Sequence, residues 1–257
     1  MGLLGIASGC SADAPQRPPP SEGPGSGVPR IVGLGGQGSE EQPLSEETRS
    51  IAATFSVFVD DLFERRERYA EPAILHFIEP LSQVTTSLPF DGIAFVSDQV
   101  PQGPSFWVAT EPTDALQLFP TLTLQDTSES ASALDLWLAD RLAIDAIFAS
   151  LITPTAVRPE SAQILFLIRD EQQQGIPGVI VSLFAAGAPL YFDAGVWTEF
   201  ADRTDASGKA FSPNVAASAL PGQDVQVVLS GSTSGEFVVR AAAGMLTIAQ
   251  LEVEEGP

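Results

Sequence analysis

A polar turn that closes on glycine and runs directly into an alternating segment constrains this chain more than any other stretch. Residues 204–208 read Thr-Asp-Ala-Ser-Gly, and an apolar alternation restarts at Ala210. Asp and Ser side chains hydrogen-bond to their own backbone in turns, and Gly adopts positive φ at little cost. The stretch therefore predicts a hairpin turn that feeds a β-strand.

Further strands are predicted on both sides of this turn. Residues 164–168 form an apolar run, and apolar residues alternate with others over residues 179–183 and 225–229. A Leu-Pro-Gly-Gln turn at residues 220–223 precedes the last of these segments. Alternation with period two is typical of half-buried strands bounded by turns. The C-terminal half is therefore expected to be rich in β structure.

The same order of elements occurs earlier in the chain, over residues 53–108. There Gly92-Ile-Ala-Phe matches Gly208-Lys-Ala-Phe, and the Pro-Gln-Gly turn at residues 101–103 matches Pro-Gly at 221–222. Self-similarity over this length predicts two copies of one domain and not a solenoid.

A family resemblance rests on three segments of the second copy. They are Gly-Ile-Pro-Gly-Val at residues 175–179 after Asp170, the turn at 204–208, and Leu-Pro-Gly at 220–222. This pattern resembles the carboxypeptidase regulatory-like domain and is similar to bacterial group 1 immunoglobulin-like domains. The resemblance covers residues 162–230 and, loosely, 53–108. It implies Greek-key β-sandwiches with accessory, adhesive or spacer roles, and no catalytic residues to carry over.

Residues 131–152 depart from the β pattern. Their apolar residues fall at spacings of three and four, which predicts an amphipathic helix with Trp137, Leu138, Leu142, Phe148 and Leu151 on one face. Residues 127–130 supply N-cap candidates, and Pro154 follows the far end. The helix is interpreted as a connector packed on the sandwiches, with partner docking as the alternative.

The expected fold class is mainly β: two tandem Greek-key immunoglobulin-like or transthyretin-like β-sandwiches with a connecting amphipathic helix. The expected division of the chain is a lipoprotein signal remnant with a lipobox at 1–10, a disordered tether rich in Pro, Gly, Ser and Glu at 11–48, a first sandwich at 49–128, helix and linker at 129–158, and a carboxypeptidase regulatory-like sandwich at 159–254.

Charge restricts the class of partner. The net charge is −21 and the pI is about 4.1, which opposes binding to nucleic acid phosphates and to anionic lipid through a basic patch. No segment approaches the ~20 consecutive apolar residues that a membrane-spanning helix needs. The composition therefore favours a soluble acidic protein without nucleic acid partners.

The single cysteine, Cys10, predicts attachment to a membrane. It ends the run Leu-Leu-Gly-Ile-Ala-Ser-Gly-Cys at residues 3–10, which resembles the lipobox of bacterial lipoproteins, where the cysteine thioether carries a diacylglycerol. Ala7 stands where leucine is usual, and residues 1–6 lack the basic residues of an n-region. The expected location is the outer membrane or cell surface, by a lipid anchor; the alternative is a lone cysteine in a disordered tail.

No constellation predicts an enzyme or a cofactor. His76 is the only histidine and lies on an apolar run, so it is interpreted as a partly buried strand residue. Asp193, Asp202 and Asp205 lack the alternating spacing of a calcium loop, and Asp205 is interpreted as a turn residue. The sequence has no Gly-x-Ser-x-Gly elbow. We expect no catalytic residues, metal or cofactor.

Three aromatic residues are the candidate contacts for a ligand or partner. Tyr191, Phe192 and Trp197 lie in a long predicted loop, residues 185–202, and would stack on sugars or anchor a protein if exposed. The competing interpretation places them in the sandwich core.

The predicted function is a non-enzymatic envelope lipoprotein that acts as a binding, adhesive or scaffold module. The alternatives are a carbohydrate-binding module that uses this loop, or an accessory subunit of an envelope enzyme or transport complex that docks through the helix.

Overall fold

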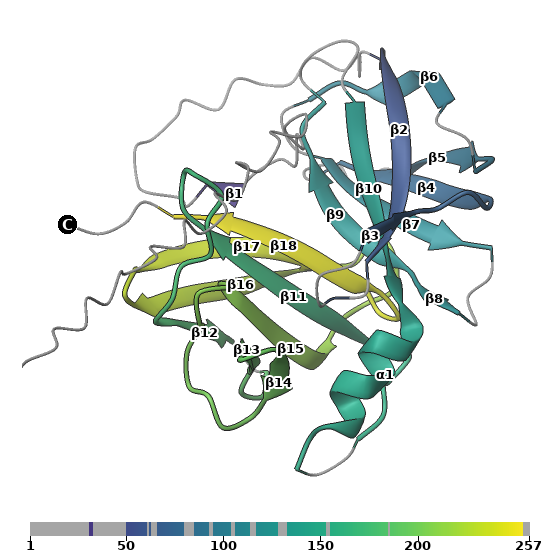
Figure 1. Ribbon diagram of the computed structural model, residues 1–257. Coiled ribbons are helices and arrows are strands. Elements are labelled where there is room, and N and C mark those ends of the chain that lie inside the picture. Colours follow the sequence, from purple (N-terminus) through teal and green to yellow (C-terminus); the bar gives the residue numbers. More distant parts are fainter. Residues whose placement is uncertain are drawn as a thin grey trace, which may run out of the picture.

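The computed structural model describes residues 31–32, 50–60, 62, 66–79, 85–92, 95–103, 106–113, 117–127, 133–152, 155–184 and 186–253. These residues form eighteen strands, arranged in three sheets, and one helix (Figure 1). The mainly β, sandwich-type fold predicted from the sequence is confirmed. No helix in the described ranges has the length and apolar character required to cross a membrane.

The described residues between 50 and 140 form strands and no helix. The strands are β2 (Ser50–Asp60), β3 (Arg66–Arg68), β4 (Ala73–Ile78), β5 (Thr85–Phe90), β6 (Phe95–Pro101), β7 (Phe106–Pro112), β8 (Leu118–Phe119), β9 (Thr121–Gln125) and β10 (Ala133–Asp140). One layer contains β2 and β10, the other contains β5, β4, β7 and β9, and the apolar residues of the two layers pack on each other. Phe55 of β2 and Phe77 of β4 meet at the centre, with ring centroids 5.8 Å apart.

The second half opens with the helix. Its elements are α1 (Arg141–Ala149), β11 (Ser161–Arg169), β12 (Val179–Leu183), β13 (Leu190–Asp193), β14 (Val196–Thr198), β15 (Lys209–Ala216), β16 (Gln223–Gly231), β17 (Gly235–Ala241) and β18 (Leu246–Glu252). A three-stranded sheet, β12-β16-β17, faces the larger sheet that contains β15, β11 and β18. The core between them includes Phe166 and Phe237, both buried.

The two halves repeat one strand topology. In each, the first strand pairs in parallel with the last strand: β2 with β10, and β11 with β18. In each, the first strand also pairs antiparallel with the strand after the matched glycine, β6 after Gly92 and β15 after Gly208. The orders β4-β7-β9 and β12-β16-β17 correspond as well. The internal repeat predicted from the sequence is therefore present in the strand pairings.

One sheet continues from one half into the other. Strand β9 pairs in parallel with β18, with Thr121 opposite Leu246 and Thr123 opposite Ile248. This pairing joins the strands of both halves into a ten-stranded sheet, in the order β14-β13-β15-β11-β18-β9-β7-β4-β5 with β1 (Ile31–Val32) on β18. Trp107 and Leu122 of the first half belong to the same apolar cluster as the core of the second half. The sequence pattern predicted two sandwiches joined by a helix and did not predict this shared sheet.

The predicted connecting helix is shorter than expected. Residues 133–140 form strand β10, and only residues 141–149 are helical. Leu134, Leu136 and Leu138 alternate into the first core, a period-two pattern that the spacing of three and four had concealed. The N-cap is Asp140, whose side chain accepts a hydrogen bond from the Leu142 N–H at 2.9 Å, and not a residue of 127–130.

Helix α1 covers the outer face of the shared sheet. Its buried residues Ile144, Ile147 and Phe148 pack with Leu165 of β11 and Phe211 of β15. Strand β11 is therefore covered on both faces, which explains its continuous apolar run.

Part of the predicted tether is ordered. Ile31 and Val32 form strand β1, which pairs in parallel with Leu251 and Glu252 of β18, just beyond the stretch that β9 occupies. The remaining residues of the range 11–48, and Cys10 itself, lie outside the described residues.

Candidate functional site

The predicted loop 185–202 contains a small hairpin at the edge of the ten-stranded sheet. Strands β13 and β14 pair antiparallel, with Phe192 opposite Trp197 and Tyr191 opposite Thr198. Ala194 and Gly195 form the turn, both with positive φ. The segment is thus an ordered edge of the sheet and not a long open loop.

The three predicted contact residues are buried. Tyr191, Phe192 and Trp197 are 3, 6 and 5% exposed. Phe192 and Trp197 lie under α1, and Trp197 also contacts Phe211, with centroids 5.8 Å apart. Tyr191 points into the core of the second sandwich. The carbohydrate-binding hypothesis required these rings to be exposed, so their burial removes its basis and supports the alternative in which they fill the core.

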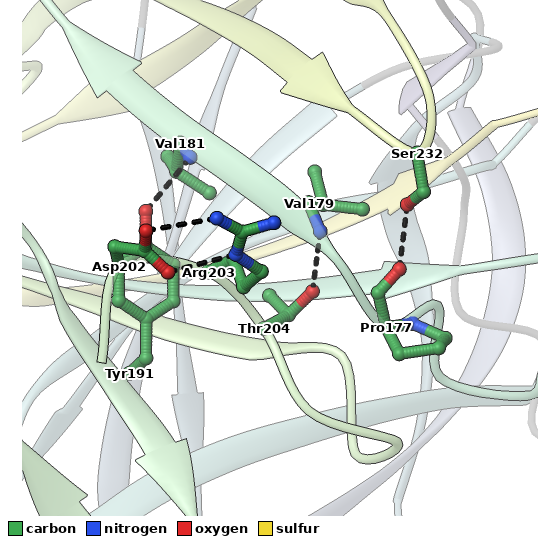
Figure 2. Close-up of polar contacts among 8 residues, drawn as sticks. All are labelled: Pro177, Val179, Val181, Tyr191, Asp202, Arg203, Thr204 and Ser232. Carbon is green, nitrogen blue, oxygen red and sulfur yellow. Dashed lines mark hydrogen bonds and ion pairs between the residues drawn. The ribbon is translucent and has the colours of Figure 1, made fainter.

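Tyr191 and Thr204 bind the backbone of edge strand β12 (Figure 2). The Tyr191 hydroxyl accepts a hydrogen bond from the Val181 N–H at 2.9 Å, and Thr204 Oγ1 accepts one from the Val179 N–H at 2.9 Å. Thr204 Oγ1 also donates to the Ile176 carbonyl at 2.7 Å. Burial raises the pKa of the Tyr191 hydroxyl, and the bond from Val181 opposes that rise. These partners occupy backbone groups that an edge strand would otherwise offer to another strand.

The aspartates considered for calcium do not converge. Asp205 accepts a hydrogen bond from the Ser207 N–H at 2.8 Å within the turn, as its interpretation as a turn residue predicted. Asp202 pairs with the neighbouring Arg203 at 2.7 Å, and both side chains are mostly exposed. Asp193 is exposed at the β13–β14 turn. Among the described residues, no group of three or more His, Cys, Asp or Glu side chains is placed to hold a metal ion.

Exposed apolar side chains border the edge strand β14. Val196 of β14 is 59% exposed, and Phe200, just after the strand, is 86% exposed. Ile152, beyond the end of α1, is 65% exposed, and its N–H donates to the Glu199 carboxylate at 2.6 Å. We call Ile152, Val196 and Phe200 the β14 rim. Phe184, directly after β12, is 88% exposed.

Most of the predicted docking face of the helix is covered within the chain. Phe148 and Leu151 are buried against the sheet, and Leu138 belongs to strand β10 in the first core. Leu142 alone of the predicted apolar stripe is highly exposed. An accessory role that uses this stripe would therefore have to rely on Leu142 alone.

His76 lies at the centre of a polar group that sequence reasoning missed. Its Nδ1 is 2.8 Å from Ser87 Oγ, and its Nε2 is 3.3 Å from Glu111 Oε2. The side chain of His76 is 20% exposed, which agrees with its interpretation as a partly buried strand residue. Ser87 and Glu111 come from the strands on either side of β4, so the strand register brings the three together.

Comparison with known proteins gives distant likeness only. No protein-family model matches the chain, and no curated protein matches it. Among solved structures, the chain is similar to a streptococcal ancillary pilin (13% identity, 80% of this chain and 70% of that one, TM-score 0.28). It is also similar to the Bacillus anthracis TIE protein (9% identity, 80% of this chain, TM-score 0.25), of which it spans only 34%. The shaft pilin SpaA of Lactobacillus rhamnosus GG is a third case (8% identity, 78% and 97% coverage, TM-score 0.23).

These neighbours include pilins, but the TM-scores are too low to carry an argument about function.

Proposed function

We propose that the protein is a non-enzymatic binding or scaffold module of the cell envelope, and that it contacts a protein partner through the β14 rim and Phe184. The observation that carries this proposal is the exposure of two phenylalanines, Phe184 at 88% and Phe200 at 86%. Large exposed apolar side chains can mark interaction surfaces, and aromatic residues dominate the energetics of such contacts.

The chain's charge favours a particular kind of partner. With a net charge of −21, the chain repels acidic surfaces at long range and attracts basic ones. A partner with an apolar patch bordered by Lys and Arg would match both features. Glu199 lies between Val196 and Phe200 in the sequence, and its carboxylate accepts a hydrogen bond from the Ile152 N–H. The β14 rim therefore contains a negative charge.

Photo-crosslinking in the producing cells tests the contact. A photo-reactive phenylalanine analogue replaces Phe200 or Phe184 in separate variants, and Gln226, exposed on the outer face of β16, is the matched control position. We expect one crosslinked protein from positions 184 and 200 and none from 226. Equal crosslinking from all three positions, or from none, would contradict the proposal.

We further propose that a lipid anchor at Cys10 attaches the protein to the membrane, which the lipobox-like run at residues 3–10 supports. Intact mass of the protein extracted from its native membrane, beside a Cys10→Ala variant, tests it. Cleavage before Cys10 with added acyl chains is the expected result, and loss of both in the variant is its control. An uncleaved, unacylated chain would overturn the anchor while leaving the crosslinking result to be judged separately.

A further inference from the structure

Three adjacent strands bring a serine, a histidine and a glutamate together on one face of the ten-stranded sheet. In the register of β4, His76 lies opposite Ser87 of β5 and opposite Ala109 of β7. Leu75 and Phe77, on either side of His76, are buried in the first core, so the imidazole projects from the opposite face. Glu111 is two residues beyond Ala109 on β7 and therefore shares that face.

The chemistry of the three groups fixes the direction of their hydrogen bonds. An ionised Glu111 only accepts, so the His76 Nε2 facing it must carry the proton. Neutral imidazole then leaves Nδ1 as an acceptor, and the Ser87 hydroxyl donates to it across 2.8 Å. Glu111 is held ionised because its side-chain contact with His76 lowers its pKa, against the opposing effect of burial.

This order of groups is that of a base-activated nucleophile. The serine hydroxyl is aimed at a bare imidazole nitrogen, and a carboxylate orients the ring from its far side. Nε2 is buried and makes no well-aligned hydrogen bond, so the 3.3 Å approach of Glu111 Oε2 is an ion-pair contact in the resting protein. Catalytic contacts of this kind are often long or poorly aligned before a substrate binds, and they tighten in the reacting complex. Ser87 is exposed, so a reagent in solution can approach its Oγ.

We propose that Ser87 is a nucleophile that takes one acyl group from an activated ester, with His76 as general base and Glu111 as a positioning residue. Ser87 Oγ forms a bond to the acyl carbon while the bond from that carbon to the leaving oxygen breaks. The Ser87 proton moves to His76 Nδ1 and from there to the leaving oxygen. The products are a serine ester and an alcohol, which makes Ser87 a site of single covalent modification and implies no turnover.

The presence of a single histidine makes this reaction straightforward to test. His76 is the chain's only histidine, so every imidazole-dependent rate measured on the purified chain belongs to this group. Ser182, an exposed serine on β12, serves as a matched control outside the group. The probe is p-nitrophenyl acetate, and the readouts are intact mass, peptide mapping and the pH dependence of the acylation rate.

We expect one acetyl group, mapped to Ser87, at a rate that rises with pH, as general-base catalysis by an imidazole requires. Ser87→Ala abolishes the adduct and Ser182→Ala retains it. Loss of the general base in His76→Gln lowers the rate by about 10²-fold or more. Glu111→Gln lowers the rate and shifts its pH profile, which a merely structural role would not do.

Three results would overturn the proposal. The first is acetylation only at other groups, such as the amine of Lys209. The second is an unchanged rate in His76→Gln with a native circular dichroism spectrum. The third is undiminished release of p-nitrophenol from Ser87→Ala, which would make the imidazole itself the nucleophile. Ser87→Thr, which retains a hydroxyl at the same exposed position, is the second variant and is expected to keep a measurable adduct.

Discussion

The ring of Phe148 on α1 meets the ring of Phe211 on β15 edge to face, with centroids 6.2 Å apart and an interplanar angle of 89°. Both residues are almost completely buried, at 2 and 0% exposure. This pair fixes the helix to the outer face of the shared sheet. The helix in turn covers Trp197.

Phe148→Ala should lower the free energy of unfolding by about 3–5 kcal/mol, because it leaves a cavity between helix and sheet. Leu142→Ala, on the exposed face of the same helix, should change it by less than about 0.5 kcal/mol. Urea titration followed by circular dichroism measures both. Equal effects of the two substitutions would show that α1 does not pack as described.

Two glycines with positive φ allow two costs of substitution to be measured separately: the strain of the left-handed backbone and the steric clash of an added Cβ. A Cβ at Gly208 (φ +65°) would lie 2.2 Å from the Ile168 carbonyl oxygen, whereas a Cβ at Gly195 (φ +88°) would meet nothing within 4 Å. Gly195→Ala should therefore cost about 1–2 kcal/mol for the left-handed backbone alone. Gly208→Ala should cost clearly more than Gly195→Ala, in thermal or urea unfolding. A comparable loss in both variants would argue against the close approach of the 204–208 turn to β11.

Thr204 holds β12 through its hydroxyl, and two substitutions test this role. Thr204→Val keeps the shape but removes the acceptor for the Val179 N–H and the donor to the Ile176 carbonyl. The loss should be about 1–3 kcal/mol, the cost of leaving buried polar groups unpaired. Thr204→Ser retains the hydroxyl and should lose less. Amide hydrogen exchange at Val179 should accelerate in the valine variant only; unchanged exchange would refute the assignment.

Tyr191 should make stability fall at alkaline pH. Burial raises its pKa, so the unfolded tyrosine, with a pKa near 10, ionises before the folded one. Its contribution is complete below about pH 10 and is lost as the pH rises through the folded pKa. Urea midpoints measured between neutral and strongly alkaline pH should decline less steeply in Tyr191→Phe. Tyr69→Phe, at the only other tyrosine, is the control and should leave the Tyr191 part of the decline in place.

The sequence was informative where strands are half buried and where turns need special residues. The alternation around residues 204–229 predicted the second sandwich, and the matched Gly92 and Gly208 segments predicted the repeated topology. It was misleading at residues 131–140, where three leucines two residues apart also satisfy helical spacing when read with their neighbours. When a short segment fits both the strand period and the helix period, the segment alone does not show which set of its residues will be buried.

The interpretation of Tyr191, Phe192 and Trp197 as ligand contacts was misleading for a related reason. The same aromatic residue types suit an exposed binding surface and a core, and only the position of α1 decides that Phe192 and Trp197 are covered. Ser87 and Glu111 gave no signal of their own, because their proximity to His76 depends on the register in which β5 and β7 pair with β4. Phe184 and Phe200 were missed because hydrophobicity alone does not distinguish an exposed phenylalanine from a buried one.

The pairing of β9 with β18 has a consequence for how a chain of this kind can evolve. Tandem domains joined only by a linker can be gained, lost or exchanged one at a time. Here each copy supplies a strand that completes the other's sheet, and Trp107 and Leu122 of the first copy lie in the core of the second. Deletion of either copy would leave an open strand edge and an uncovered apolar face on the survivor. The two copies are therefore expected to be inherited as one indivisible unit.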